Sequence, residues 1–236
     1  MRLAVAGLSV EINEPRFGLF ASRAEPYICP GRGEPDVTLA LKDSYLEHRA
    51  KDNPGLSPAE WEYMLTGEAF YNELLLHGGF MLHASAVEYE GEAYLFSAPS
   101  GTGKSTHTHL WLEYFNGKAK IINDDKPAII RDGGGFSACG TPWSGKTAES
   151  ENTRCPLRGI AFIERAKENS AERISVPRAL HMLLDQTVRP TDRARMANLL
   201  DLLDGLLECV PVYILRCNMT EDAVRTAYGA MSSTGY

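Results

Sequence analysis

The order of apolar and polar residues predicts a β-rich N-terminal lobe followed by a larger region of alternating strands and helices. Short apolar runs bounded by glycine, proline or charged residues predict β structure over residues 1–42; these runs are 3–6, 9–12, 17–21 and 36–41. We expect a small antiparallel lobe here. It either covers an edge of the main sheet or helps to bind a substrate. Residues 43–56 are polar and are expected to be irregular.

A long helix is predicted to begin after Ser57. Ser57 is the N-cap, Pro58 takes the first helical position, and Glu60 completes a Ser-x-x-Glu capping box. Apolar side chains at helical spacing are expected to be buried on one face; they are Trp61, Met64, Leu65, Phe70, Leu74 and Leu75. Glycines 78 and 79 end this helix.

The rest of the chain alternates between strand and helix patterns. Strands are predicted over 80–89, 92–96, 118–123, 127–130, 136–139, 158–164 and 210–215. Helices are predicted over 104–115, 176–187, 191–208 and 220–231. A polar turn covers 167–172, and a long loop continues from 140 to 155. The pattern predicts an α/β protein with a lobe over residues 1–56 and a main domain over 57–236.

Composition narrows the class of protein. The chain has 236 residues and a formal net charge of −7, which argues against a nucleic-acid partner. No apolar run reaches the roughly 18 residues of a membrane-spanning helix, and the first residues do not fit a signal peptide. Five cysteines without a Cys-x-x-Cys pair indicate reduced thiols. We therefore expect a cytoplasmic protein.

A glycine-rich segment supplies the strongest chemical signal. The sequence Ser100-Gly101-Thr102-Gly103-Lys104-Ser105-Thr106 follows the apolar run 93–96 and opens the predicted helix 104–115. This is the Walker A pattern of strand, loop and helix, in which backbone N–H groups and the helix N-terminus bind nucleotide phosphates. Lys104 would reach the β and γ phosphates, and Ser105 would ligand Mg²⁺. The position that usually opens the pattern with Gly is Ala98.

Other polar residues complete a candidate site. Asp124 and Asp125 follow the predicted strand 118–123, where a metal ligand and a general base are expected in such folds. His83 lies on the strand before the one that leads into the loop. Lys146 and Arg154 either contact phosphate or substrate, or lie in solvent. In the same long loop, Trp143 either packs on an adenine or is buried.

These pieces together resemble the HPr kinase/phosphorylase and P-loop phosphoenolpyruvate carboxykinase superfamily. The resemblance covers residues 80–165 and rests on Leu82-His83-Ala84-Ser85, on the 100–106 loop and on Asp124-Asp125. It implies a P-loop core with a mixed sheet, with Lys104 and Ser105 holding ATP and Mg²⁺. It also implies Asp124 as general base, Asp125 as metal ligand and His83 beside them, and the two Asp roles can be exchanged.

The resemblance implies an ATP-dependent phosphotransferase. The short HPr-kinase-like proteins fit better than HPr kinase or the carboxykinase themselves, because the chain lacks their additional substrate segments. The expected partners are a nucleotide and a hydroxyl on a peptide, protein or small molecule, with no nucleic acid and no membrane; a homo-oligomer is left open. The alternatives are a nucleotide-binding regulatory module without transfer chemistry, and a simple NTPase.

Overall fold

The longest strand, β10 (Arg154–Arg165), joins the two parts of a nine-stranded mixed sheet. The computed structural model describes residues 1–233. The first residues of β10 pair antiparallel with β9, and its later residues pair in parallel with β6 and β12. The other strands of this sheet are β4 (Gly79–Met81), β5 (Ala84–Tyr89), β6 (Glu92–Ser97), β7 (Lys120–Asn123), β8 (Ala128–Asp132), β9 (Gly135–Cys139), β11 (Ser170–Arg173) and β12 (Val212–Cys217).

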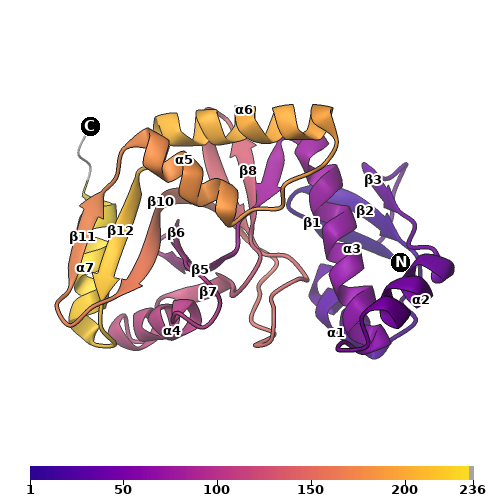
Figure 1. Ribbon diagram of the computed structural model, residues 1–236, viewed down its shortest axis with the longest axis horizontal. Coiled ribbons are helices and arrows are strands. Elements are labelled where there is room, and N and C mark those ends of the chain that lie inside the picture. The colour runs from indigo at the N-terminus through magenta and orange to yellow at the C-terminus, as the bar shows by residue number, and fades with distance from the viewer. Residues whose placement is uncertain (234–236) are drawn as a thin grey trace.

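Helices cover both faces of this sheet. Helices α5 (Val176–Asp185) and α6 (Arg193–Cys209) pack on one face, and α4 (Lys104–Tyr114) and α7 (Glu221–Ser232) pack on the other (Figure 1). Successive side chains of a strand point to opposite faces of the sheet. In β6, Leu95 therefore faces α5 and α6, while Tyr94 and Phe96 face α4 and α7. The predicted mixed α/β architecture is confirmed. No helix within residues 1–233 has the length and apolar character needed to cross a membrane.

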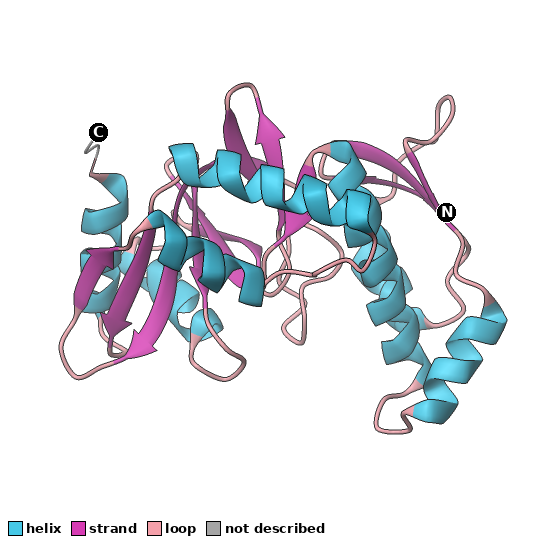
Figure 2. Cartoon of the chain, turned by 45° about the horizontal axis from the view of Figure 1, so that its top comes forward, coloured by secondary structure: helices cyan, strands magenta, loops and turns pink. Residues whose placement is uncertain are grey.

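A separate three-stranded sheet forms the other end of the molecule (Figure 2). It contains β1 (Arg2–Val5), β2 (Leu8–Ile12) and β3 (Val37–Leu39), in that order. Strands β1 and β2 are antiparallel, but β2 and β3 are parallel, so the prediction of an antiparallel lobe is wrong for β3. The chain between β2 and β3 contains α1 (Gly18–Ala24) and a short 3₁₀ turn, η1 (Glu25–Tyr27), and this length allows the return to a parallel strand.

Two segments that were not predicted as helices are helical. The run 17–21, expected to be β, belongs to α1, where Phe20 and Ala24 are buried at a spacing of four residues. An apolar run of five residues does not distinguish a strand from a helix. Residues 43–56, expected to be irregular, contain α2 (Asp43–Asp52), whose one buried residue is Leu46. Leu46 packs against side chains of α3, so tertiary contact rather than periodicity stabilises α2.

Helix α3 (Pro58–Leu74) begins as predicted. The Ser57 side chain accepts from the Glu60 backbone N–H, and the Glu60 carboxylate accepts from the Ser57 backbone N–H. A second 3₁₀ turn, η2 (Leu75–His77), follows, and Gly78 closes it in the left-handed conformation. The expected stripe is buried except for Met64, which is 48% exposed. Phe70 packs in the same core cluster as Leu3 of β1. The boundary at residue 56 stays a prediction.

Two strand predictions in the main sheet need correction. Residues 80–89 form two strands, β4 and β5, with Leu82 and His83 between them. The strands separate because β4 pairs with β8, whereas β5 pairs with β6 and β7. The predicted polar turn 167–172 overlaps β11, an edge strand that pairs antiparallel with β12. Its exposed position explains its polar sequence.

Candidate active site

Sheet topology brings His83, the glycine-rich loop and Asp124 together at one edge of the main sheet, the edge formed by the carboxyl ends of β6 and β7. Strand β5 is antiparallel to both of its neighbours, so β6 and β7 run in the same direction. The register pairs Ala84 with Ser97 and Ala86 with Asn123. His83, the loop after β6 and Asp124 after β7 therefore meet at this edge. Ligands of α/β sheets commonly bind at the carboxyl ends of parallel strands.

The glycine-rich loop leaves backbone donors free at the start of α4. Gly101 and Gly103 have φ values of 78° and 123°, which favour glycine, and open space lies where a Cβ would project from either residue. Gly103 is the N-cap of α4, and no side chain caps the helix there. The first N–H groups of a helix lack intrahelical partners and carry partial positive charge. This geometry suits an anion.

Lys104 lies at the centre of the site with only 7% of its surface exposed. Its Nζ donates to the carbonyl oxygen of Ala98 at 3.0 Å. Burial lowers the pKa of Lys104, and the charges of Asp125 and Asp124 oppose this effect. The ammonium group thus contacts the loop and lies within the electrostatic reach of Asp125 and Asp124.

Asp124 is 5% exposed and accepts a hydroxyl hydrogen bond at each of its oxygens. Ser85 of β5 donates to Oδ1 at 2.6 Å, and Thr147 of the long loop donates to Oδ2 at 2.9 Å. Ser85 in turn lies 2.8 Å from the hydroxyl of Thr108 on α4. Sequence reasoning gave no role to Ser85, although Ser85 belongs to the 82–85 motif, and it missed Thr108 and Thr147, because isolated hydroxyl residues in a helix and a loop give no pattern.

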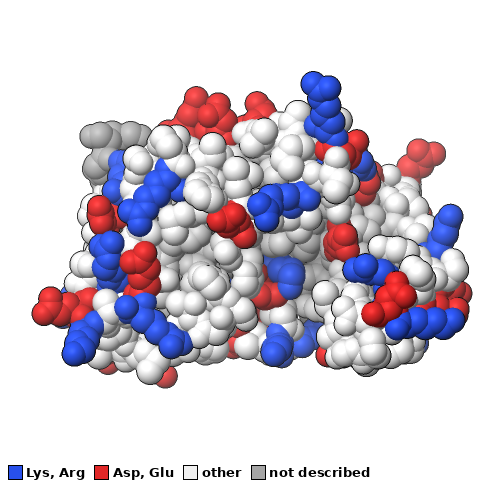
Figure 3. All heavy atoms as spheres, in the orientation of Figure 1, with Lys and Arg blue, Asp and Glu red and all other residues white. Residues whose placement is uncertain are grey.

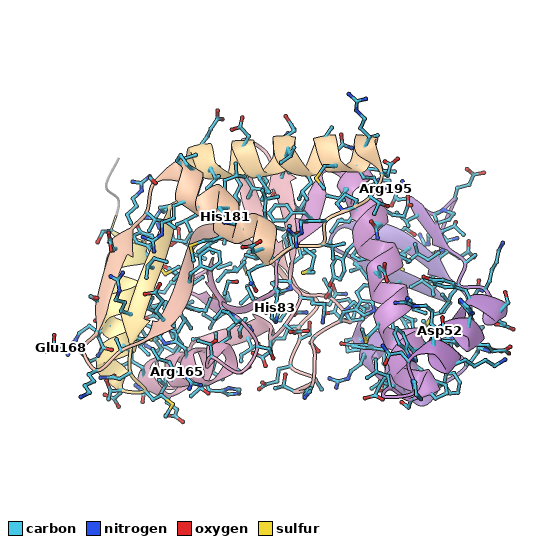
Figure 4. The ribbon with its side chains drawn as sticks, viewed as in Figure 1. Asp52, His83, Arg165, Glu168, His181 and Arg195 are labelled. Atoms are coloured by element: carbon cyan, nitrogen blue, oxygen red, sulfur yellow. The ribbon has the colours of Figure 1, made fainter. Side chains whose placement is uncertain are left out.

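Asp125 pairs with His83 and Lys126. His83 Nε2 lies 3.3 Å from Asp125 Oδ1, and the Lys126 ammonium contacts Oδ2. On its other side, His83 Nδ1 lies 3.0 Å from the side-chain oxygen of Gln186. Burial raises the pKa of Asp125, but the His83 hydrogen bond and the Lys126 charge outweigh burial and lower the pKa to about 2. Asp125 is therefore ionised at neutral pH. Figure 4 shows His83 near the centre of the molecule.

The structure places Arg154 away from the glycine-rich loop. Arg154 begins β10, at the opposite end of that strand from the site, and pairs with Asp132 at 2.7 Å. Arg165 ends β10, and its guanidinium donates to the carbonyl oxygens of Thr102 and Gly101 at 2.9 and 2.6 Å. In Figure 4, Arg165 lies beside α4. Arg165 comes directly after the predicted strand 158–164. This position at the carboxyl end of a strand is the sequence signal that could have identified it.

Lys146 lies in the part of the long loop that approaches Asp125. Its neighbour Gly145 packs so closely on Asp125 that an added Cβ would lie 2.8 Å from the Asp125 Cβ. The Lys146 side chain is exposed. Hydrogen bonds from Ser57 lower the pKa of Glu60 at the start of α3, and the charge of Lys146 adds a smaller effect. Its predicted phosphate or substrate contact stays a prediction.

A hollow of about 460 Å³ opens beside the glycine-rich loop. It is lined by Gly101, Thr102 and Gly103, by Thr106, His107 and Leu110 of α4, and by residues at the ends of β10 and β12. His107 is buried, and its Nε2 accepts a hydrogen bond from Trp111 Nε1 at 3.1 Å. Burial lowers the pKa of His107 to about 4. Next to the candidate anion site, the protein thus offers a cavity partly lined by apolar groups.

The low pKa of His107 leads to a pH-dependent stability. In the unfolded chain a histidine binds its proton near pH 6.5, so between that pH and about 4 the unfolded state binds more protons. The free energy of unfolding should fall by about 2 kcal/mol between about pH 7.5 and about pH 5 from this residue alone. Denaturant unfolding at both values should show a smaller fall in His107→Gln. His181→Gln, at an exposed site, is the control; equal falls in wild type and His107→Gln would contradict the prediction.

Two residues at this edge could hold a magnesium ion. The Ser105 hydroxyl is at the start of α4, and Asp125 supplies an ionised carboxylate. Hydroxyl and carboxylate oxygens suit Mg²⁺, which takes its remaining ligands from phosphates and water in nucleotide sites. Among residues 1–233, no cluster of three or more His, Cys, Asp or Glu side chains could hold a metal by itself.

Comparisons with known proteins identify no family for the chain. No protein-family model matches the sequence. No curated protein matches it either. A search of solved structures finds the Hpr(Ser) kinase/phosphatase from Coxiella burnetii, with a TM-score of 0.36 and 10% identity over 65% of this chain and 99% of that chain. This likeness is distant, and the assignment of a reaction rests on the site itself.

Proposed function

We propose that the protein is an ATP-dependent kinase that transfers the γ-phosphoryl group to a hydroxyl of a peptide, protein or small molecule in the cytoplasm. One observation carries this proposal: the buried Lys104 and the buried Asp124 lie at the same sheet edge as a glycine-rich loop with free backbone donors. Phosphoryl transfer needs positioning and neutralisation of charge, and a hydroxyl acceptor also needs a base. The loop supplies positioning, Lys104 supplies neutralisation of charge, and Asp124 supplies the base.

Each residue has a distinct role in the proposed reaction. The loop 100–106 and Lys104 bind and orient the phosphates, and Mg²⁺ held by Ser105 and Asp125 would neutralise phosphate charge. The acceptor hydroxyl attacks the γ-phosphorus while its proton passes to Asp124, and the bond to the β–γ bridging oxygen breaks. The contact between a hydroxyl and Asp124 Oδ2 supports Asp124 as the base, and the low pKa of Asp125 supports its role toward the metal. His83 orients Asp125.

The nucleoside would occupy the hollow beside the loop. Leu110 and Ile163 offer apolar contact for a base, and the polar groups of Asn218 and the glycine loop border the same space. On the face shown in Figure 3, basic and acidic side chains are interspersed, and neither sign gathers in a broad patch. A small nucleotide in a local site fits this surface better than a polyanion, which needs an extended basic face.

Hydrolysis without an acceptor is a weaker candidate. An NTPase commonly uses an arginine at the transferring phosphate and a residue that orients water. Arg154, which the sequence predicted as a possible phosphate contact, pairs with Asp132 at the far end of β10. Arg165 is closer but is engaged with the carbonyl oxygens of the loop. Asp124 with its hydroxyl partners is better suited to a hydroxyl acceptor.

Transfer of label from γ-labelled ATP with Mg²⁺ into peptides, free amino acids and a cell extract tests the kinase. Wild type should label an acceptor. Lys104→Met should bind ATP about 10- to 100-fold more weakly and lose transfer, because a charged hydrogen-bond donor to phosphate is removed. Lys118→Met, at an exposed lysine after α4, is the matched control and should behave as wild type. Binding of ATP without labelling of any acceptor, this chain included, would support the regulatory module instead.

A further inference from the structure

One segment of the long loop, residues 145–149, reaches into the candidate active site. Figure 1 shows the loop that follows β9 running between α4 and the helices α1 and α3. Thr147 Oγ1 donates to Asp124 Oδ2 at 2.9 Å. Thr147 Oγ1 also accepts from the Glu149 backbone N–H at 3.4 Å. Its hydroxyl thus contacts the candidate base in the way that an acceptor hydroxyl must.

The backbone on both sides of this segment is anchored in the protein. Before it, Trp143 is buried in the core. After it, the Ser150 Oγ lies 3.2 Å from the carbonyl oxygen of Ile122 and 2.8 Å from that of Thr141, so its hydroxyl can donate to either. These contacts fix the two ends of the segment and leave Thr147 at its exposed tip. The hydroxyl is therefore presented to Asp124 by a loop with little freedom at its ends.

Backbone strain next to Thr147 also indicates a functional conformation. Ala148 has a φ of 70°, in the left-handed region that a residue with a Cβ rarely adopts. Such a conformation is unfavourable for a residue with a Cβ and persists where surrounding contacts impose it. Thr147, the residue before Ala148, makes the hydrogen bond with Asp124.

A second contact holds the segment against the helix that follows the glycine loop. His109 Nε2 lies 3.0 Å from Glu149 Oε1, and His109 Nδ1 lies 2.7 Å from the carbonyl oxygen of Ser105. In addition, the Asp124 backbone N–H donates to the carbonyl oxygen of Glu149 at 3.1 Å. The segment thus contacts Asp124, which follows β7, through Thr147, and it contacts α4 through the pair formed by Glu149 and His109.

We propose that Thr147 is a phosphorylation site of this protein and that its own active site modifies it in cis. The inference rests on the proposed kinase function. The Thr147 oxygen forms a bond to the γ-phosphorus of ATP, and its proton passes to the Asp124 carboxylate. The bond between the γ-phosphorus and the β–γ bridging oxygen breaks, and ADP leaves with the electron pair. One phosphoryl group is added to each chain.

Modification would also change the loop. A phosphothreonine carries nearly two negative charges at neutral pH, so it cannot keep the hydrogen bond that the Thr147 hydroxyl makes with Asp124. Repulsion from Asp124 and Asp125 would move residues 145–149 away from the base. The position that Thr147 occupied would then be open to another hydroxyl.

The test uses the full chain with Mg²⁺ and ATP, and it combines intact mass, peptide mapping and ADP release. Wild type should gain one phosphoryl group, mapped to Thr147, at a fractional rate independent of protein concentration. Thr147→Val should lose this label, and Thr147→Ser should regain it. Thr153→Val, a second threonine of the same loop, should keep the wild-type label. Asp124→Asn should lower the rate by about 10²–10⁴-fold.

Two kinds of failure can be separated. ADP release, or labelling of another acceptor, with Thr147 unmodified would overturn this inference and leave the kinase proposal standing. A fractional rate that rises with protein concentration would overturn modification in cis. A protein that neither binds nor consumes ATP would overturn the kinase proposal and this inference together. Thermal unfolding of each variant checks that the loss of label is not a loss of fold.

Discussion

Replacement of Asp124 by asparagine is expected to lower phosphoryl transfer by about 10²–10⁴-fold while ATP still binds. Asparagine has nearly the shape of aspartate, and its oxygen can still accept from Ser85 or Thr147, so the fold should persist. It cannot take up the proton of an acceptor hydroxyl. Label transfer under saturating ATP measures the rate, and a separate equilibrium measurement gives the affinity for ATP.

Asp132→Asn is the matched control for this prediction. Asp132 ends β8, and its carboxylate contacts Arg154 and Ser137 away from the glycine-rich loop. We expect its transfer rate to stay near that of wild type. If Asp124→Asn kept the full rate while Asp125→Asn lost it, the two carboxylates would have exchanged roles. A full rate in both variants would remove the base from the proposed mechanism.

Replacement of Trp143 by alanine is expected to lower the free energy of unfolding by about 3–5 kcal/mol, which is the cost of removing a large buried aromatic side chain. Its ring stacks on Phe70 and Phe20, with centroids 5.0 and 5.8 Å away, and its Nε1 donates to Thr66 Oγ1 at 3.2 Å. The sequence left open whether Trp143 packs on an adenine, and the structure buries it in the core instead.

Denaturant unfolding measures this loss, and an exposed site in the same loop provides the control. Lys146→Ala should change stability by no more than about 0.5 kcal/mol, since it alters only a solvent-exposed side chain. Gly67 tests the same packing from the other side, because a Cβ there would lie 2.8 Å from the Trp143 ring. A Trp143→Ala protein as stable as wild type would show that the ring does not tie the loop to α1 and α3.

The sequence predicted correctly those elements of the site whose signals come from residues that are neighbours in the chain. The run before the loop, the glycines at positive φ and the helix from Lys104 lie next to one another in the chain, and the structure forms them as β6, the loop and α4. The Ser57 capping box is equally local. In these segments the backbone conformation follows from the residues themselves, so a single sequence contains the information.

Other features depended on contacts between distant parts of the chain. Helix α2 has one buried side chain, Leu46, and its packing on α3 rather than its own periodicity defines it. The distant placement of Arg154 and the approach of Arg165 follow from β10 crossing the whole sheet, so that its two ends lie far apart. From the sequence, Arg154 is expected in the long loop as a possible phosphate or substrate contact, and no role is predicted for Arg165.

The sequence by itself determined that a glycine loop precedes a helix and that an aspartate pair follows a later strand. Only the tertiary structure decided which groups surround Asp124. Ser85, 39 residues before it, and Thr147, 23 residues after it, reach its two oxygens. The reason is that strand pairing and the buried Trp143 anchor set these positions, and a hydroxyl side chain has no pattern in the sequence that reports its partner.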